Sequence, residues 1–229
     1  MTKWMSPLVT TSKGRERSPG SSSERKRTKK HGRHLYCRTV TVTWNCRSIR
    51  NKDSYLSLLV NIHRPSVICL QETRLQDQPD PTVLKLYHPY RRYEGLDVAI
   101  YIHKTLIQTE ATLNTPLEAV ASRVRFNNTY LAICSLYLPP NTPIVDDDII
   151  SLFSQLSGNR LVLGDFNAHH QQWGSERSSV REEQIVDLKL QKKLCLLNDG
   201  SATRVDERTG NASAINLSLL SPGILPDFS

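Results

Sequence analysis

The sequence lacks the long apolar segments that membrane and secreted proteins carry. No stretch approaches the ~18 consecutive apolar residues that span a bilayer, and the N-terminus has no apolar centre of a secretory signal. We therefore expect a protein that is neither secreted nor embedded in a membrane and that resides in the nucleus or cytoplasm.

Cysteine is scarce, odd in number and without the spacing of a metal or redox motif. No CxxC pair occurs among the five cysteines. Two of them, Cys69 and Cys134, lie inside the apolar runs SVICL and LAICSL, where a free thiol packs as a small hydrophobic group. The pattern argues against a zinc cluster or a disulfide framework, and we expect reduced thiols.

A basic surface is also missing from most of the chain, although the formal net charge is +8. Residues 1–34 hold ten of the 30 Lys and Arg residues and two of the 22 Asp and Glu residues. Residues 35–229 therefore carry 20 charges of each sign, and the pI of about 9.4 describes an appendage rather than a basic domain.

Residues 1–34 form a tail rich in Ser, Gly and like charge, and we predict that this tail is disordered. Within it, Arg25, Lys26 and Arg27 could act as a nuclear-import signal or as an arm that contacts nucleic-acid phosphates. A solvated tail with no dedicated partner, or upstream sequence translated by accident, is the alternative.

Hydrophobic patterning predicts order from about Leu35 to Ser229, in one domain. The strand predictions are 39–44, 66–73, 97–106, 119–126, 129–140, 160–165 and 213–221, and the helix predictions are 52–65, 145–158 and 181–194. Runs of strands interrupted by single helices are neither strict βα alternation nor all-β. They predict an α/β fold in which two packed mixed sheets are flanked by helices.

Several predicted strands end in polar residues of the same kind. Asn45 ends the first, Glu72 follows the second, Tyr137 ends a later one, and GDFN delivers Asp165 and Asn167. Carboxylates and amides grouped at one edge suit a hard cation such as Mg²⁺, which can activate a water next to a phosphoryl group. Residues two apart on a strand point the same way, so Asp165 and Asn167 could face a single phosphate.

Each of these residues also has a structural interpretation. Glu72 could be an ordinary surface carboxylate, and Asn45 could cap the turn that follows it. Asp165 and Asn167 could form an Asx-turn.

Taken together and in order, the motifs WN (44–45), LQET (70–73), SLYLPP (135–140) and GDFN (164–167) resemble those of the endonuclease/exonuclease/phosphatase family. The continuation GDFNAHHQQWGS, followed by a helix and SAINLSLLSPG, is similar to the endonuclease domain of non-LTR retrotransposons of the R1/Jockey kind. The resemblance covers roughly residues 36–229.

The resemblance implies a four-layer α/β sandwich and a Mg²⁺-dependent phosphodiesterase that nicks DNA, with Mn²⁺ as an alternative ion. It assigns metal binding to Glu72, support of the metal and phosphate site to Asn45, and contact with the scissile phosphate to Tyr137. Asp165 matches the residue that orients or deprotonates the attacking water, and Asn167 the residue that binds the phosphate.

The remaining residues of GDFNAHHQQWGS are less informative. His169 and His170 are adjacent, so they do not suit one metal ion, and the resemblance implies that they shape the loop or touch DNA. We predict that Trp173 anchors the core.

Two departures from the family pattern bear on activity. Asn216 stands where the family carries an Asp that orients a catalytic His, and an amide cannot supply that negative charge. The family also closes with a Ser-Asp-His motif on a last strand, whereas this chain stops at Ser229 in the loop before it. We therefore expect a domain truncated at its C-terminus and impaired, because acid–base groups are worth about 10²–10⁴-fold in rate.

Three functions remain open at this stage. The first is the endonuclease, with DNA as partner and a reverse transcriptase that the full element would have but this chain lacks. The others are a non-catalytic nucleic-acid-binding remnant and a phosphatase on the same fold. The target sequence and the oligomeric state are left open.

Overall fold

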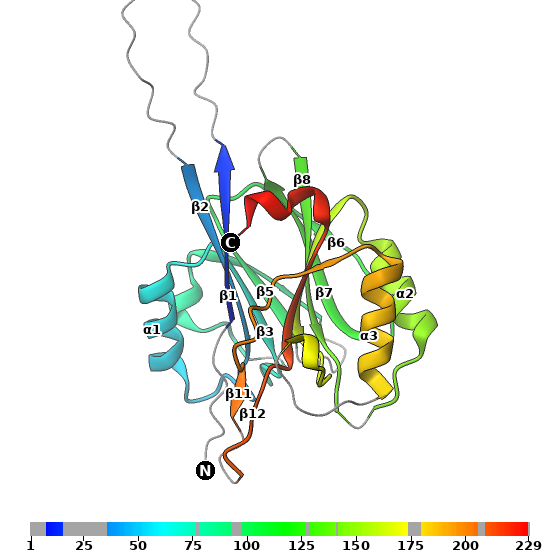
Figure 1. Ribbon diagram of the computed structural model, residues 1–229. Coiled ribbons are helices and arrows are strands. Elements are labelled where there is room, and N and C mark those ends of the chain that lie inside the picture. Colours follow the sequence, from blue (N-terminus) through cyan, green and yellow to red (C-terminus); the bar gives the residue numbers. More distant parts are fainter. Residues whose placement is uncertain are drawn as a thin grey trace, which may run out of the picture.

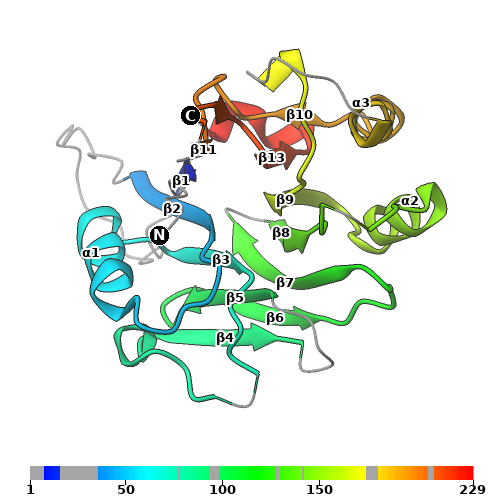
Figure 2. The ribbon, with the colours of Figure 1, turned by 90° about the horizontal axis from the view of Figure 1, so that it is seen from below.

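The protein folds as two β-sheets packed face to face, with helices on both outer faces (Figures 1 and 2). The computed structural model describes residues 8–15, 36–76, 78–92, 98–126, 129–140, 142–173, 180–205 and 209–228. Helix α1 (Asp53–His63) lies outside one sheet, and α2 (Asp146–Gln155) and α3 (Val180–Gln191) lie outside the other. The predicted α/β sandwich is confirmed.

The first sheet is mixed and has the strand order β1-β2-β3-β5-β4. Strands β2 and β3 run parallel, and the crossover helix α1 joins them. The bounds are β1 Leu8–Arg15, β2 Tyr36–Asn45, β3 Val67–Gln71, β4 Tyr87–Arg91 and β5 Val98–His103, and the 3₁₀ helix η1 (Thr82–Leu84) precedes β4.

The second sheet has the order β10-β13-β9-β8-β7-β6, with α2 joining the parallel pair β8 and β9. Its bounds are β6 Gln108–Ala111, β7 Glu118–Phe126, β8 Thr129–Tyr137, β9 Asn159–Asp165, β10 Cys195–Leu196 and β13 Asn216–Leu220. The remaining elements are the small ribbon of β11 (Arg204–Val205) and β12 (Ala212–Ser213), and the 3₁₀ helices η2 (Gln171–Trp173) and η3 (Pro222–Asp227).

Local sequence explains the main elements. Helix α1 buries Leu56 and Leu59 and ends where Arg64 turns left-handed, immediately before Pro65. Helix α2 begins with three aspartates, which favour the positive end of the helix dipole, and it buries an apolar stripe. Strand β3 is buried along its whole length, which is why it reads as the continuous apolar run VICL.

The core is layered like the fold. Between the sheets, β3 and β5 contribute residues such as Cys69 and Ile100, and β9 contributes Leu161 and Leu163. Trp173 packs in the outer cluster under α2 and α3, 1% exposed, so its predicted role as a core anchor is confirmed. None of the four cysteines with described side chains forms a disulfide, and three of them are buried.

Gly164 allows the backbones of β8 and β9 to approach closely. A Cβ built at this position would lie 1.7 Å from the carbonyl oxygen of Leu136, the register partner of Gly164 on β8. The aliphatic strand that leads to Asp165 therefore needs a glycine one residue before it, because any side chain would push β9 away from its neighbour.

The tail differs from the prediction at Leu8–Arg15. These residues are not disordered but form β1, which pairs antiparallel with β2 along its whole length. Thr10 and Thr11 are buried, since they cover the backbone edge and one face of β2. The high charge of the tail as a whole hid this short β-branched segment. Residues 1–7 and 16–35, including Arg25, Lys26 and Arg27, lie outside the described residues.

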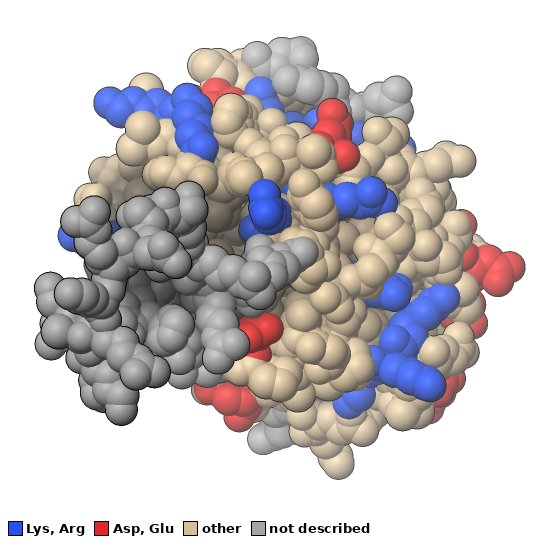
Figure 3. All heavy atoms as spheres, turned by 90° about the horizontal axis from the view of Figure 1, so that it is seen from above, with Lys and Arg blue, Asp and Glu red and all other residues tan. Residues whose placement is uncertain are grey.

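Two edge strands, β4 and β6, were also not predicted. Strand β4 carries Pro89, which is tolerated because β4 pairs only with β5. Among the described helices, none has the length and apolar character needed to cross a membrane. Figure 3 views the end of the sandwich away from Asp165, and there Lys and Arg side chains occur in separate groups rather than in one continuous patch.

Candidate active site

Four strands end at the same end of the sandwich, the one seen from below in Figure 2. In the first sheet, β2 and β3 run parallel and deliver Asn45 and Glu72. In the second, β8 and β9 run parallel and deliver Tyr137 and Asp165, which are register partners. The sandwich thus brings together four of the predicted site residues that the sequence separates by as many as 120 positions.

Asn45 joins the two sheets at this point. Its Nδ2 donates to Oε1 of Glu72 at 2.8 Å and to Oδ2 of Asp165 at 2.7 Å, and its side chain is almost fully buried. Its Oδ1 accepts the N–H of Arg47 at 3.1 Å, so the residue also caps the following turn. One amide therefore serves both roles that the sequence left open, and it fixes the spacing of the two carboxylates.

Glu72 lies at the mouth of the site, with 18% of its side chain exposed. Its backbone adopts a left-handed conformation, with φ of 52°, directly after β3. The hydroxyl of Tyr137 hydrogen-bonds this carboxylate, and burial, followed by the charge of Glu72, raises the pKa of Tyr137. Tyr137 therefore stays protonated at neutral pH and keeps a hydrogen to donate.

Asp165 is the most buried carboxylate of the site, 2% exposed. Burial raises its pKa from 3.8 to about 6, against the hydrogen bonds from Asn45 and from the N–H of Asn167, which lower it. The charge of Glu72 raises the pKa further, and that of Arg204 lowers it. The pKa of Asp165 thus lies close to neutral pH, where a carboxylate works best as a general base.

Asn167 corrects one geometric prediction. It does not continue the strand, because β9 ends at Asp165 and Asn167 has a φ of 45°. Its N–H donates to Oδ1 of Asp165 at 3.0 Å, which is the Asx-turn alternative, and its Nδ2 donates to the carbonyl of Leu138 at 3.0 Å. Asp165 and Asn167 are therefore neighbours through a turn rather than through strand alternation.

Asn216 lies directly opposite Asp165 in the antiparallel pair of β13 and β9. It is fully buried, and neither atom of its side-chain amide has a hydrogen-bond partner. An amide without partners in a buried position costs stability, and the replacement of an orienting Asp by Asn216 stays a prediction.

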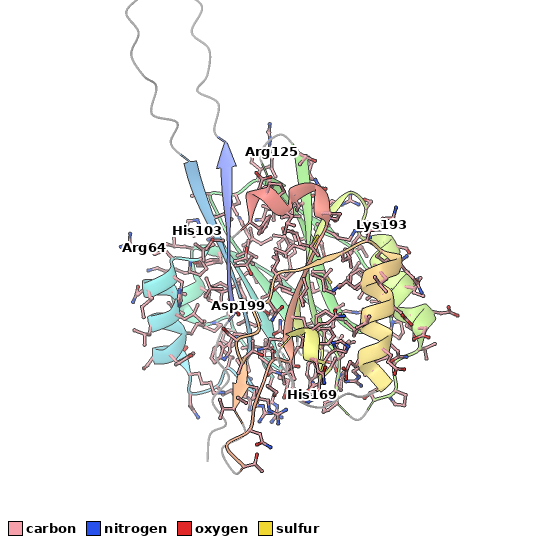
Figure 4. The ribbon with its side chains drawn as sticks, viewed as in Figure 1. Arg64, His103, Arg125, His169, Lys193 and Asp199 are labelled. Carbon is pink, nitrogen blue, oxygen red and sulfur yellow. The ribbon has the colours of Figure 1, made fainter. Side chains whose placement is uncertain are left out.

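His169 and His170 lie in the loop after β9, at the same end of the sandwich (Figure 4). The Nε2 of His170 is 3.6 Å from Oε1 of the buried Glu182, and its ring stacks near Trp173. Burial and the charge of Arg204 lower the pKa of His169. No histidine among the described residues is hydrogen-bonded to Asn45, Glu72 or Asp165, and the predicted contact of His169 and His170 with DNA stays a prediction.

Sequence reasoning missed two supports of the site. Gln71 is fully buried and donates to Oγ of Ser135 at 2.9 Å, which ties the sheets together beneath Asn45. Arg181, at the start of α3, donates to several carbonyls around Asn167. The only available signals were a polar residue inside a buried strand and a charged residue at a helix start, and neither is distinctive.

The donor set fits a hard divalent cation. The carboxylates of Glu72 and Asp165 lie on either side of the Asn45 amide, and the pKa of the inner one, Asp165, is raised. Mg²⁺ is commonly held by one or two carboxylates plus waters. Across the described residues, no group of three His, Cys, Asp or Glu side chains gathers into a denser metal site.

Comparisons with known proteins show which proteins the chain is similar to. A family model described as "Endonuclease-reverse transcriptase" matches residues 131–228. The RNA-directed DNA polymerase from mobile element jockey of Drosophila melanogaster is 24% identical over 167 residues, which make up 70% of this chain and 18% of that protein. These matches support a resemblance to the endonuclease/exonuclease/phosphatase family. The predicted resemblance to the non-LTR retrotransposon members of this family is confirmed.

Solved structures of endonuclease/exonuclease/phosphatase proteins share the fold. The endonuclease domain of TRAS1, a telomere-specific non-LTR retrotransposon, superposes with a TM-score of 0.68 and 18% identity over 81% of this chain and 85% of that one. An AP endonuclease from Archaeoglobus fulgidus superposes with a TM-score of 0.58 and 15% identity, over 80% of this chain and 86% of that one. The chain spans less than a fifth of the length of the curated relatives that it matches.

Proposed function

We propose that this chain is a Mg²⁺-dependent phosphodiesterase that nicks DNA, as the endonuclease domain of a non-LTR retrotransposon. One observation carries the proposal. The buried amide of Asn45 holds Glu72 of one sheet and Asp165 of the other within hydrogen-bond distance of a single nitrogen. A residue that only caps the turn needs the bond from the N–H of Arg47 to Oδ1 of Asn45. A site with paired carboxylates needs the two bonds from Nδ2 to Glu72 and Asp165.

Each residue has a role that its environment supports. Asp165, with a pKa of about 6, is mostly ionised at neutral pH and accepts a proton from the attacking water. When DNA binds, Tyr137 would redirect its hydroxyl hydrogen from Glu72 to a phosphoryl oxygen, and Asn167 lies beside Asp165 to bind the same phosphate. Glu72 would hold the metal ion, and that ion, when bound, neutralises charge on the phosphoryl oxygens.

We propose in addition that the rate is reduced. Asn216 cannot supply the negative charge that orients an imidazole in the family, and its buried amide has no hydrogen-bond partner. In the complete element, the nick would prime reverse transcription by a polymerase domain outside this chain. The proposed site of action is therefore nuclear DNA.

The test is nicking of supercoiled plasmid with Mg²⁺, with Mn²⁺ as a second ion and EDTA as a blank. Glu72→Ala and Asp165→Ala should each abolish nicking, because they remove the metal ligand and the base. The matched control is Glu110→Ala, which removes an exposed carboxylate from β6 and should leave the rate unchanged.

Nicking that survives both site substitutions would overturn the assignment. Hydrolysis of a phosphomonoester with no nicking of DNA would instead favour a phosphatase on the same fold. DNA binding without any hydrolysis, lost when residues 1–34 are deleted, would favour a non-catalytic binder.

A further inference from the structure

Arg181 sits in the first turn of α3, where its guanidinium reaches three separate segments of the chain. Nη1 donates to the carbonyl of Leu138 at 3.1 Å and, more weakly, to that of Phe166 at 3.5 Å. Nη2 donates to the carbonyls of Pro139 at 2.8 Å and Thr142 at 2.6 Å. The fork thus holds the end of β8, the turn after it, and the turn after β9.

These carbonyls belong to the backbone that carries the candidate site. The Leu138 carbonyl accepts from both Arg181 and Nδ2 of Asn167, while the Leu138 N–H donates to the carbonyl of Asp165 at 2.9 Å. Leu138 also directly follows Tyr137. The two backbone groups of one residue, Leu138, therefore link Tyr137, Asp165 and Asn167, and Arg181 is bonded to its carbonyl.

The side chain is half-buried and tethered to the core by its own helix. Helix α3 packs on the outer cluster through Ile185 and Leu188, one and two turns further along. The guanidinium is planar and presents several donors in a rigid fork, whereas an ammonium is a single point charge with no fork. Four carbonyls in these directions can be satisfied by Arg and cannot all be satisfied by Lys.

We propose that Arg181 is the positioning residue of the second-sheet half of the site, holding Tyr137, Asp165 and Asn167 in register through the backbone of Leu138. This inference rests on the proposed function for its catalytic consequence. Its structural content stands apart, since it concerns the order of the turns at 138–142 and 166–167.

Two substitutions separate the fork from the charge, and a third is a matched control. Arg181→Lys keeps the charge without the fork, and Arg181→Met removes both. Arg160→Lys changes another half-buried arginine. It lies at the start of β9, the end opposite Asp165, and donates to the carbonyl of Phe153. Nicking kinetics and amide hydrogen exchange by NMR are measured for each protein, with thermal unfolding to confirm that it is folded.

The expected result is a fall in kcat of about 100-fold for Arg181→Met, as for a catalytic group displaced by about 1 Å, and of at least ~10-fold for Arg181→Lys. KM for DNA should change less than about twofold, because positioning acts on the transition state. Exchange of the Leu138 and Asn167 amides should accelerate at least ~10-fold in both variants, and Arg160→Lys should change none of these quantities.

Full kcat in Arg181→Lys would overturn the proposal, because charge alone would then suffice. A rise in KM at constant kcat would also overturn it, since Arg181 would then bind substrate directly. If wild type does not nick at all, the proposed function fails, and the exchange of the two amides alone decides the role of Arg181. If Arg181→Met does not fold, Arg181→Lys provides the same test.

Discussion

Replacing Asp165 with Asn removes a buried negative charge while nearly keeping the shape of the side chain. In the wild type, burial raises the pKa of Asp165 from 3.8 to about 6. A carboxyl whose pKa is raised on folding stabilises the protein below its unfolded value of 3.8, and this contribution is lost as the pH rises through about 6. The difference between the two pKa values corresponds to roughly 3 kcal/mol.

The hydrogen-bond cost of the substitution is separate from this charge effect. The wild-type carboxylate accepts from Nδ2 of Asn45 and from the N–H of Asn167, and an amide with one oxygen cannot accept from both. This loss is about 1–3 kcal/mol. Asp165→Asn should therefore be clearly less stable than wild type at pH 4 and close to it at pH 7.

Urea unfolding of both proteins at pH 4, 5, 6 and 7, in EDTA, measures the effect. The free energy of unfolding of the variant relative to wild type should rise by roughly 2–2.5 kcal/mol across this range, because pH 4 already lies just above the unfolded pKa of 3.8. Asp187→Asn, at an exposed position of α3, is the control and should give a flat difference. A difference for Asp165→Asn that stays flat, or that falls as the pH rises, would refute the reasoning about burial.

Two further predictions concern Asn216 and β1. Asn216→Leu removes two buried, unpaired amide atoms and should stabilise the protein by about 1–3 kcal/mol in thermal unfolding; a loss of stability would show that the amide has a partner in solution. Deletion of residues 1–15 uncovers the backbone edge of β2 and should lower the urea midpoint and promote association in light scattering. An unchanged midpoint would mean that β1 contributes nothing, and Ala at Arg25, Lys26 and Arg27 provides a charge-only control.

Local patterning predicted most of the sandwich because the burial of each helix or strand shows in the pattern of apolar residues over a short stretch of sequence. Strand β3 is buried on both faces and reads as an apolar run, and α1 stops before Pro65. The polar residues that follow β2, β3, β8 and β9 could be grouped in advance, since the ends of neighbouring parallel strands meet at one edge. The family motifs placed the same residues.

Local patterning failed where a distant partner decides the conformation. Strand β1 forms because it pairs with the backbone edge of β2. The composition of the tail does not show that this edge is available. Asn167 leaves the strand because Leu138 and Asp165 accept its two donors. In the sequence Arg181 has no feature that distinguishes it from other helical residues, because the four carbonyls that it binds belong to other segments.

The sequence by itself determined the α/β class, the helices and strands of the core, and which side chains end up at the edge where the strands stop. It could do so because burial and strand direction are encoded in runs of a few residues. Only the tertiary structure decided that Asn45 bridges Glu72 and Asp165, that Asp165 is dry enough for its pKa to rise to about 6, and that Arg181 holds the turns. Distances, desolvation and shared acceptors arise between segments as far as 120 residues apart, so they exist only once both sheets have packed.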